Sequence, residues 1–364
     1  MKIARVVFEL DFGGVEKVTE LAVKGFQSID GTSLQTISLG KGGRVSESLI
    51  KEGHSVWVMN QKAKIPDFFL IVRLAIFFRK EGIDGVHTVG AEANFHGLLA
   101  GALAGVPVRI GEEIGFPRHH FLYRLLFRFT YIFAHRVICV SEAVKQHLYH
   151  IGELPLSKAK VIYNPIELPE VKAASQGRSD SLAFITVSRL TGIKNIEAVV
   201  RALAAIVYET AFRPKLMIVG EGEERTALAA LTLELQVDAF VTFTGYQERV
   251  FGLLAESDVF VLPSFSEGSS LALAEAMHAG LPSIVTKVGG ASEILGDTDS
   301  GILIDPDSLE DLKQAMLSFL TLPPSELAEM GMRARKQAGR FSVENYCTEL
   351  SSLYSGLPIK AKKS

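Results

Sequence analysis

The chain has 364 residues, of which 48% are hydrophobic and 22% charged, with a formal net charge of −3. This length favours two domains of ordinary size, and the composition excludes a largely disordered chain. Two cysteines, Cys139 and Cys347, are too few for a disulfide framework or a cysteine-rich metal cluster, so a reducing compartment is expected.

We expect neither a signal peptide nor a membrane span in this sequence. The N-terminal stretch meets Glu9 and Asp11 too early for a signal peptide. No apolar run reaches the roughly 18–20 residues that a span needs, since Arg73 interrupts one candidate and Arg124 and Arg128 another. We therefore expect a cytoplasmic protein, with peripheral contact to the cytoplasmic face of a membrane left open.

Charge is distributed unevenly along the chain. Residues 1–170 contain 20 Lys and Arg against 17 Asp and Glu, whereas the remainder contains 18 against 24. Eight of the nine histidines also lie in the first part. This asymmetry indicates that one domain faces something anionic.

Short apolar runs alternate with helical patterns, which favours parallel sheets wound with helices. In the first half we expect strands at 3–8, 56–59, 86–88, 108–110, 137–140 and 161–163. A second series is expected at 183–187, 216–219, 241–243, 259–262, 283–286 and 302–304. The pattern predicts an α/β fold of two Rossmann-like domains that face each other across a cleft, with ligands beyond the carboxyl ends of the strands.

Domain boundaries follow from the same pattern. Residues 168–181 are polar and lack apolar periodicity, so they are the expected linker. It separates an N-terminal domain, 1–167, from a C-terminal domain, 182–340. Residues 341–354 predict a helix within a C-terminal segment, 341–364.

Two segments of the first half combine basic and aromatic residues. They are 65–80 and 117–136, and no acidic residue occurs between Glu113 and Glu142. Such segments can lie in a membrane interface, and core helices with charged outer faces show the same pattern, so both interpretations stay open. The overall acidity and the absence of a nucleic-acid motif argue against a nucleic-acid partner.

The most informative stretch is 264–280, which reads SFSEGSSLALAEAMHAG and follows a predicted buried strand. Ser269 or Ser270 can cap a helix over 271–279, which Gly280 ends. The loop then offers free backbone N–H groups at a helix N-terminus, and these bind anions.

Two carboxylates lie near these N–H groups. Glu267 is in the loop, and Glu275 is eight positions further, in the helix. A ligand with a phosphate in the middle and hydroxyl-rich groups on both sides fits the layout, and nucleotide sugars have that shape. Together with its flanking residues, the stretch resembles the Glu-x7-Glu signature of retaining glycosyltransferases of the GT-B fold, family 4 in particular. The resemblance covers nearly the whole chain and is strongest over 181–301. In the proteins that it resembles the last helix crosses back onto the first domain, so we expect the same of the helix at the start of 341–364.

The resemblance implies transfer of a sugar from a nucleotide diphosphate sugar to a hydroxyl of a saccharide or lipid-linked acceptor, with retention and without a metal or cofactor. Arg189 and Lys194 match the family's basic pair, which stabilises the departing diphosphate. Glu267 would contact the transferred sugar, and Glu275 would hold the ribose hydroxyls. Cell-surface polysaccharide or lipopolysaccharide synthesis is the expected setting.

Further binding positions are implied by the same resemblance. The backbone amides beside Glu267 would lie near the sugar hydroxyls and the β-phosphate; these residues are Gly268, Ser269, Ser270 and Leu271. Gly220 and Gly222 follow a predicted strand and resemble the glycine turn at the nucleotide, although two structural turns would give the same pattern. Gly13 and Gly14 resemble the glycine loop of the N-terminal domain, for which a plain strand-to-helix turn is the alternative.

One departure from the family lies on the acceptor side. Many relatives have a histidine where this chain has Ile114. Glu112 or Glu113 could take the polar role, with Glu113 as our chosen candidate, or His119 or His120 could reach in. His87 is expected to be structural.

Two other functions stay open. A nucleotide-sugar epimerase of similar fold would need acid/base carboxylates, for which Glu112 and Glu113 are the candidates. A non-catalytic nucleotide-sugar-binding module is the second alternative, which the missing histidine motivates. Asp-x-Asp pairs at 297–299 and 305–307 are interpreted as solvated turns, so no metal site is expected.

Overall fold

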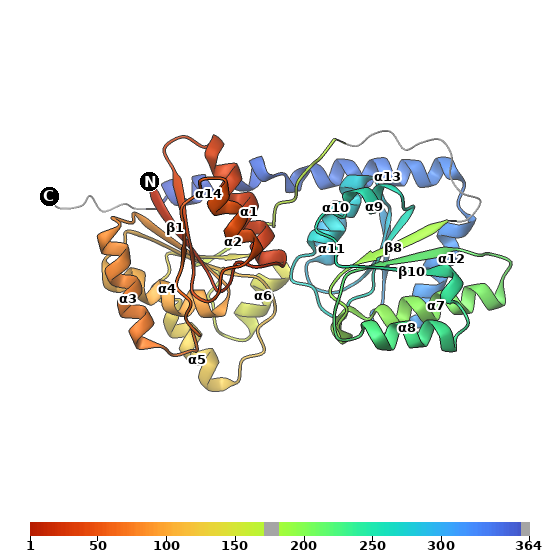
Figure 1. The fold of residues 1–364 in the computed structure, drawn as a ribbon, viewed down its shortest axis with the longest axis horizontal. Helices are drawn as coiled ribbons and strands as arrows, with labels where there is room; N and C mark the ends of the chain where they lie inside the picture. The colour runs from red at the N-terminus through yellow and green to blue at the C-terminus, as the bar shows by residue number, and fades with distance from the viewer. Residues whose placement is uncertain (171–181, 358–364) are drawn as a thin grey trace. The chain divides into compact units, whose positions relative to one another are not determined.

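The computed structural model describes residues 1–170 and 182–357, which divide into two compact units (Figure 1). Unit 1 comprises Met1–Ile166 together with the C-terminal segment from Phe341, and unit 2 comprises Glu167–Arg340. Most of the expected linker, residues 171–181, lies outside the described residues.

Unit 1 is built on a seven-stranded parallel sheet with the strand order β3-β2-β1-β4-β5-β6-β7. Its strands are β1 (Lys2–Val7), β2 (Ser33–Ser38), β3 (Val56–Val58), β4 (Gly85–Val89), β5 (Val108–Glu113), β6 (Arg136–Cys139) and β7 (Ala159–Val161). The order reverses between β1 and β4, which is the point where Rossmann-like sheets bind ligands.

Helices cover both faces of this sheet (Figure 1). One layer packs on the main apolar core and consists of α3 (Phe68–Lys80), α4 (Ala91–Ala104), α5 (Phe121–Thr130) and α6 (Glu142–His150). The other contains α1 (Gly14–Gly25), the short helix η1 (Phe26–Ser28), α2 (Arg44–Lys51) and the C-terminal α14 (Val343–Ser355), which η4 (Gly339–Phe341) precedes.

Unit 2 has a six-stranded parallel sheet with the order β10-β9-β8-β11-β12-β13. Its strands are β8 (Ala183–Val187), β9 (Lys215–Val219), β10 (Val241–Gly245), β11 (Val259–Leu262), β12 (Ser283–Thr286) and β13 (Gly301–Ile304). The order again reverses once, between β8 and β11.

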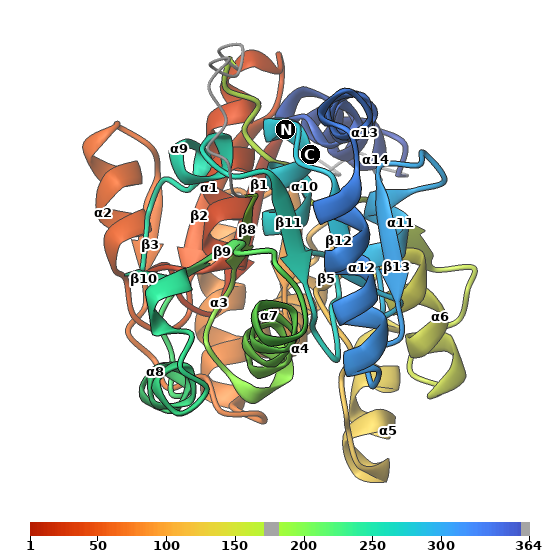
Figure 2. The same ribbon diagram turned by 90° about the vertical axis from the view of Figure 1, so that its right-hand side faces the viewer.

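The helices of unit 2 form two layers. Figure 2 shows them in a view turned by 90° from that of Figure 1. One contains α7 (Ile196–Glu209), α8 (Arg225–Glu234) and α12 (Leu309–Thr321); the other contains α9 (Phe251–Ala255), α10 (Leu271–Ala279), α11 (Ala291–Leu295) and α13 (Pro324–Ala338). Two short helices, η2 (Gly192–Lys194) and η3 (Asp238–Phe240), lie in the connections. The predicted α/β class with two Rossmann-like domains is therefore confirmed.

The strand β2 was not predicted from the sequence. Its residues read SLQTIS, and the polar Thr36 and Ser38 are fully buried in it. A strand with so many hydroxyl side chains has no apolar run, which is the pattern that indicates a buried strand. The other strands lie within a few residues of their predicted bounds.

The strand β5 continues three residues beyond its predicted end and so includes Glu112 and Glu113. Successive side chains of a strand point to opposite faces of the sheet. Glu112 accordingly points to the layer of α1 and α14, whereas Glu113 points to the layer of α4 and α5. The two adjacent carboxylates therefore belong to separate environments.

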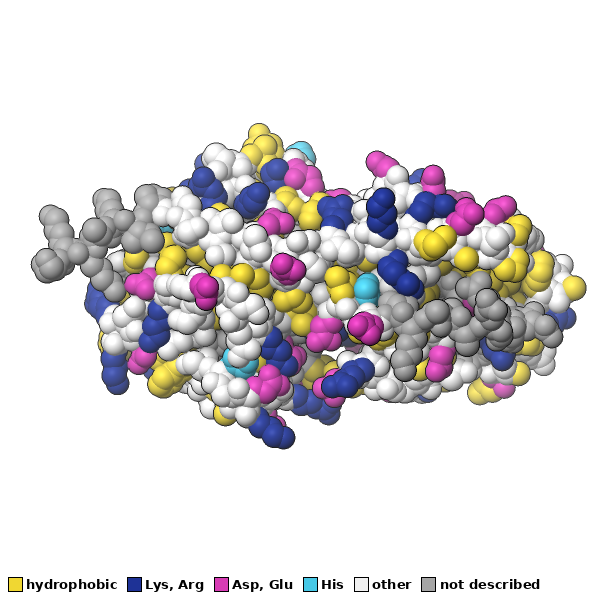
Figure 3. Space-filling view, turned by 90° about the horizontal axis from the view of Figure 1, so that it is seen from above, with side chains coloured by type: hydrophobic (Ala, Val, Ile, Leu, Met, Phe, Trp, Pro, Cys, Tyr) yellow, Lys and Arg dark blue, Asp and Glu magenta, His cyan; other side chains and the backbone are white. Residues whose placement is uncertain are grey.

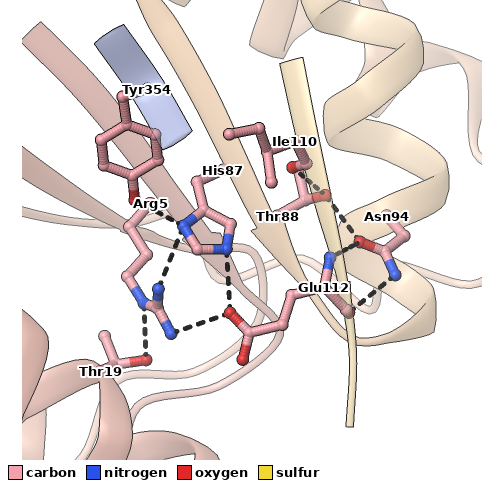
Figure 4. Close-up of polar contacts among 8 residues, drawn as sticks. All are labelled: Arg5, Thr19, His87, Thr88, Asn94, Ile110, Glu112 and Tyr354. Carbon is pink, nitrogen blue, oxygen red and sulfur yellow. Dashed lines mark hydrogen bonds and ion pairs between the residues drawn. The ribbon is translucent and has the colours of Figure 1, made fainter. Parts of the chain in front are cut away.

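Glu112 is part of a fully buried polar network at the centre of unit 1 (Figure 4). Its Oε2 lies 3.4 Å from Nη2 of Arg5 and 2.9 Å from Nε2 of His87. Burial is the largest single influence and favours the neutral carboxyl, but the Arg5 charge and the contact with His87 together outweigh it and lower the pKa of Glu112. Burial and the charge of Arg5 both lower the pKa of His87. The ring is therefore neutral and lies between Arg5 and Glu112.

The same network attaches α14 to the sheet. Nδ1 of His87 lies 3.2 Å from Nη1 of Arg5 and 2.7 Å from the Tyr354 hydroxyl of α14. Close packing supports this contact, because a Cβ on Gly25 of α1 would lie 2.6 Å from Sγ of Cys347. The polar contacts of Tyr354 and the close packing on Gly25 thus hold the C-terminal helix against the rest of unit 1.

Replacing Glu112 by Gln should destabilise unit 1 by about 3–5 kcal/mol, because it leaves the Arg5 charge buried without its counter-ion. Urea unfolding followed by Trp57 fluorescence measures this, since Trp57 is the one tryptophan of the chain and lies in β3. The control Glu52→Gln removes an exposed partner of Lys24 and should leave the stability nearly unchanged. Equal effects of the two variants would contradict the role of Glu112.

Candidate functional site

The predicted donor residues lie on the loops at the carboxyl edge of the unit 2 sheet. The strands are parallel, so the connections after β8, β9 and β11 all emerge at this edge. Since β8 lies between β9 and β11, these three connections are neighbours. The change of strand order between β8 and β11 marks the expected ligand position.

The connection after β8 contains Arg189 and Lys194. Its backbone is bonded to the next connection, because Leu190 N–H donates to the Glu221 carbonyl at 2.8 Å and Glu224 N–H to the Leu190 carbonyl at 3.0 Å. Arg189 is exposed, and within residues 1–170 and 182–357 its guanidinium has no hydrogen-bond or ion-pair partner. It is therefore a cation held on a fixed backbone and open to a ligand.

Gly220 and Gly222 make this close approach possible. A Cβ on Gly220 would lie 1.8 Å from the Ser188 carbonyl oxygen, and one on Gly222 would lie 2.2 Å from that of Leu190. Gly220 also has a φ of +136°, which side-chain-bearing residues rarely adopt. Both glycines are thus required where the two loops touch.

Lys194 and Glu267 form an ion pair across the site. Their Nζ and Oε1 atoms lie 2.6 Å apart, and the Ser264 hydroxyl donates to the same oxygen at 2.8 Å. The Glu267 side chain is 8% exposed and that of Lys194 18%, so the pair is largely shielded from water. Ser264 was not among the predicted site residues, although its position two residues after the end of β11 places it at the carboxyl edge of the sheet.

The loop that carries Glu267 is anchored on two sides. Phe265 N–H donates to the Ile193 carbonyl at 2.9 Å, and Gly290 N–H to the Glu267 carbonyl at 3.0 Å. The Thr286 hydroxyl donates to the Ser264 carbonyl at 2.6 Å. These bonds fix the carboxylate before any ligand arrives, which is the preorganisation that electrostatic catalysis needs.

The helix α10 begins and ends where the sequence predicts. Ser270 is the N-cap, and its hydroxyl accepts from Leu273 N–H at 3.3 Å, whereas Gly280 ends the helix in the left-handed conformation. Gly268 and Ser269 are half-buried in the loop before it, and Leu271 is its first residue. Glu275 is half-buried in its second turn.

A pocket of about 220 Å³ lies at the same edge of the unit 2 sheet, between the starts of α7 and α12. Pro263, Phe265 and Thr286 line its inner side, and Glu197, Asp305 and Asp307 are among its polar lining residues. It includes none of the predicted donor residues. The predicted donor residues accordingly lie on the loops after β8, β9 and β11 and not in this pocket.

In unit 1, Gly13 and Gly14 stand at the corresponding edge, after β1. Gly13 is the N-cap of α1 with a φ of +148°, and both glycines are exposed. A Cβ on Gly13 would lie 2.5 Å from Oε2 of Glu16, the acidic residue in the first turn of α1. The loop therefore makes a tight turn into the N-terminus of α1.

Glu113, at the end of β5, is buried among polar groups. It accepts from the Asn94 amide at 2.8 Å and from the Tyr131 hydroxyl. Burial raises the pKa of Glu113 to about 7, which leaves it partly protonated near neutral pH. Neither Asn94 nor Tyr131 was among the predicted residues, since their contacts with Glu113 join separate elements.

The histidines considered for the acceptor side have local partners. Nδ1 of His119 lies 2.9 Å from Oε1 of the buried Glu153. The His119 ring also stacks on the Phe127 ring, with 4.6 Å between the ring centroids. His87 is fully buried, as expected of a structural residue. Ile114 is exposed directly after β5, and His120 is also exposed.

Two family models match this chain over adjacent stretches. "Glycosyltransferase Family 4" matches residues 12–169, and "Glycosyl transferases group 1" matches residues 169–337. The chain belongs to the family 4-like glycosyltransferases. This confirms the family that the sequence motifs indicated.

Curated relatives agree with this membership. The chain is 34% identical to N-acetyl-alpha-D-glucosaminyl L-malate synthase of Bacillus anthracis, over 47% of this chain and 44% of that protein. It is 27% identical to UDP-Gal:alpha-D-GlcNAc-diphosphoundecaprenol alpha-1,3-galactosyltransferase of Escherichia coli, over 70% of each. The chain thus spans less than half of the first relative's length and about two thirds of the second's.

Solved structures share the fold. HepE of Anabaena, solved in complex with UDP, has a TM-score of 0.84 at 20% identity, over 98% of this chain and 100% of that one. A glycosyltransferase of Rickettsia africae also has a TM-score of 0.84 at 20% identity, over 100% and 99%. These likenesses establish the GT-B fold.

Gly220→Ala should destabilise unit 2 by about 2–3 kcal/mol, because the new methyl group meets the Ser188 carbonyl and the φ is unfavourable. Gly252→Ala is the matched control: its Cβ meets nothing within 4 Å, so stability should stay equal or rise by up to about 1 kcal/mol. Calorimetry measures both, with Trp57 fluorescence identifying the unit 1 transition. An unaffected Gly220→Ala would show that the loops do not need this approach.

Burial raises the pKa values of Glu113 and Glu153 to about 7, above the ordinary carboxyl value of 4.5. The folded state then binds protons more tightly than the unfolded one, so this stabilisation is present below pH 4.5 and lost as the pH rises through about 7. Glu113→Gln should flatten the fall in unit 1 stability between these values. Urea unfolding by Trp57 fluorescence tests this, and an unchanged slope in the variant would contradict it.

Proposed function

We propose that the chain transfers a sugar from a UDP-sugar to a hydroxyl of a saccharide or lipid-linked acceptor, with retention at the anomeric carbon and without a metal ion. The observation that carries the proposal is the arrangement of Arg189, Lys194 and Glu267 beside the start of α10, at the carboxyl edge of the unit 2 sheet. The proposed setting is cell-surface polysaccharide or lipopolysaccharide synthesis.

The charges of the site fit a diphosphate between two hydroxyl-bearing groups. Arg189 and Lys194 supply positive charge, and the N-terminus of α10 supplies backbone N–H donors. Glu267 has a second oxygen beyond the one that Lys194 and Ser264 engage, and this can accept from a sugar hydroxyl. Glu275, in the second turn of α10, is the proposed partner of the ribose hydroxyls.

The printed names of relatives support the choice of donor and acceptor. HepE is solved with UDP-glucose as well as with UDP. The name of the Escherichia coli relative includes a UDP-Gal donor and a diphosphoundecaprenol-linked sugar. A relative from Campylobacter jejuni, 25% identical over 71% of this chain and 72% of its own length, also has a diphospho-undecaprenol-linked acceptor in its name.

The proposed reaction needs no protein nucleophile. The bond between the anomeric carbon and the β-phosphate oxygen breaks, and UDP leaves with the electron pair. The acceptor hydroxyl attacks the same face of the sugar, and its proton passes to the departing phosphate oxygen. The residues of unit 2 orient the donor and stabilise the charge that develops on the diphosphate.

The acceptor side is proposed to involve Gly13, Gly14 and Glu113 of unit 1. The partly protonated Glu113 can donate or accept a hydrogen bond, which suits recognition of a sugar hydroxyl. The epimerase alternative is weakened, because Glu112 is committed to Arg5 and His87. One of its two candidate carboxylates is thereby unavailable for acid/base chemistry.

Arg189→Ala and Glu275→Gln should each lower kcat/KM for transfer by roughly 100-fold, since each removes a contact to the donor. Arg213→Ala and Glu234→Gln are matched controls, exposed and remote from the Glu267 loop, and should leave transfer unchanged. The assay uses a panel of UDP-sugars with lipid-linked and free saccharide acceptors, with and without EDTA. NMR of the product gives its anomeric configuration.

Full turnover in Arg189→Ala and Glu275→Gln would overturn the assigned roles, and an inverted product would overturn retention. Activity that EDTA abolishes would overturn metal independence. UDP binding without transfer or hydrolysis across the whole panel would instead favour a non-catalytic binding module.

A further inference from the structure

Helix α5 of unit 1 exposes a row of large apolar side chains. Phe121 is 71% exposed, Leu122 68%, Leu125 47% and Phe129 52%. At 3.6 residues per turn these four positions fall within an arc of about 100°, so they form one stripe along the helix. We call Phe121, Leu122, Leu125 and Phe129 the α5 stripe. Single exposed apolar residues are ordinary, but a continuous row marks an interaction surface.

Basic residues accompany the α5 stripe. Arg124 and Arg128 are exposed on α5 itself, and the exposed Arg118 and Arg136 lie before and after it. No acidic residue occurs from 114 to 141. On the face seen in Figure 3, by contrast, acidic and basic side chains are interspersed and hydrophobic ones form small groups.

Helix α3 repeats the same pattern. Phe68, Phe69, Val72 and Ile76 are exposed on one side of it, and the exposed Arg73, Arg79 and Lys80 lie on the same side. The two helices belong to one layer of unit 1, and the Tyr123 hydroxyl of α5 donates to the Ile65 carbonyl just before α3 at 3.3 Å. Their inner residues, among them Leu74 and Phe127, are fully buried, so the outer side chains are not required for the core.

We propose that the α5 stripe docks onto an anionic lipid surface. Apolar side chains of such a helix enter the boundary between headgroups and acyl chains, while arginines beside them bind lipid phosphates. The absence of acidic residues over 114–141 suits this occupant. A second copy of the chain suits it less, because two stripes flanked by arginines would repel each other.

The inference deepens the proposed use of lipid-linked acceptors, and it rests on the surface of α3 and α5 and not on the donor site. No helix among the described residues is long and apolar enough to cross a bilayer. Docking through the α5 stripe would bring unit 1 to the surface in which lipid-linked acceptors are embedded.

Cosedimentation of the full chain with vesicles tests the proposal. The wild type should bind vesicles of phosphatidylcholine with phosphatidylglycerol and should not bind phosphatidylcholine alone. R124Q/R128Q should lower binding by roughly tenfold or more, since each basic residue at an anionic surface contributes a factor of about five. F121Q/L122Q should lower it by roughly tenfold or more through lost apolar burial.

Leu233→Gln is the matched control, because Leu233 is an equally exposed leucine on α8 of unit 2, and it should bind like the wild type. Absence of wild-type binding to the anionic vesicles would overturn the proposal. So would equal binding by the wild type and both double variants.

Two further measurements separate the alternatives. Sedimentation velocity should show the same monomer for the wild type and F121Q/L122Q; a dimer that this variant dissociates would make the stripe a subunit contact and overturn the proposal. The thermal shift with UDP should be equal in both proteins, and an equal unfolding transition by Trp57 fluorescence shows that unit 1 of the variant is folded. Failure of UDP to stabilise even the wild type, with vesicle binding intact, would count against the proposed donor and leave this inference standing.

Discussion

The candidate site depends on one constraint: the strands of unit 2 are parallel, so successive connections meet at one edge of the sheet. Lys194 and Glu267 are 73 positions apart in sequence, yet β8 and β11 pair directly and bring them to 2.6 Å. Backbone bonds between the connections then hold them in place, and Gly220 and Gly222 allow those bonds to form. The chemistry of the side chains is therefore secondary to a backbone arrangement that only glycine permits.

The two units use buried carboxylates in opposite ways. In unit 1, Glu112 is enclosed with Arg5 and His87, and its charge is matched within the core, so it serves stability. In unit 2, Glu267 also has a basic partner, but both lie on loops at the carboxyl edge of the sheet and retain some exposure. Arg189, on the same connection as Lys194, is exposed. Charge that is balanced internally supports the fold, whereas charge held open at an edge is available to a ligand.

The sequence predicts best where local signals suffice. The bounds of α10 and its Gly280 end follow from small, apolar and capping residues within one short stretch, and the family follows from Glu267 and Glu275. The strand β2 was missed because its buried positions include Thr36 and Ser38, which do not form an apolar run. The pairing of Arg5 with Glu112, 107 positions away, has no local signal at all. Such pairs depend on strand order, which the spacing of residues does not encode.

Net charge also proves a poor guide to the chemistry of a site. Residues 171–364 carry more acidic than basic side chains, yet unit 2 presents Arg189, Lys194 and a helix N-terminus at the carboxyl edge of its sheet. Coulomb interactions across water fall off within about 10 Å at ordinary ionic strength, so distant surface acids barely act on a bound phosphate. The same reasoning applies to unit 1, where the basic excess of residues 1–170 is small but the stretch over 114–141 has no acid. What an anion meets is the local arrangement, and both halves of the chain concentrate positive charge where an anionic group is proposed to bind.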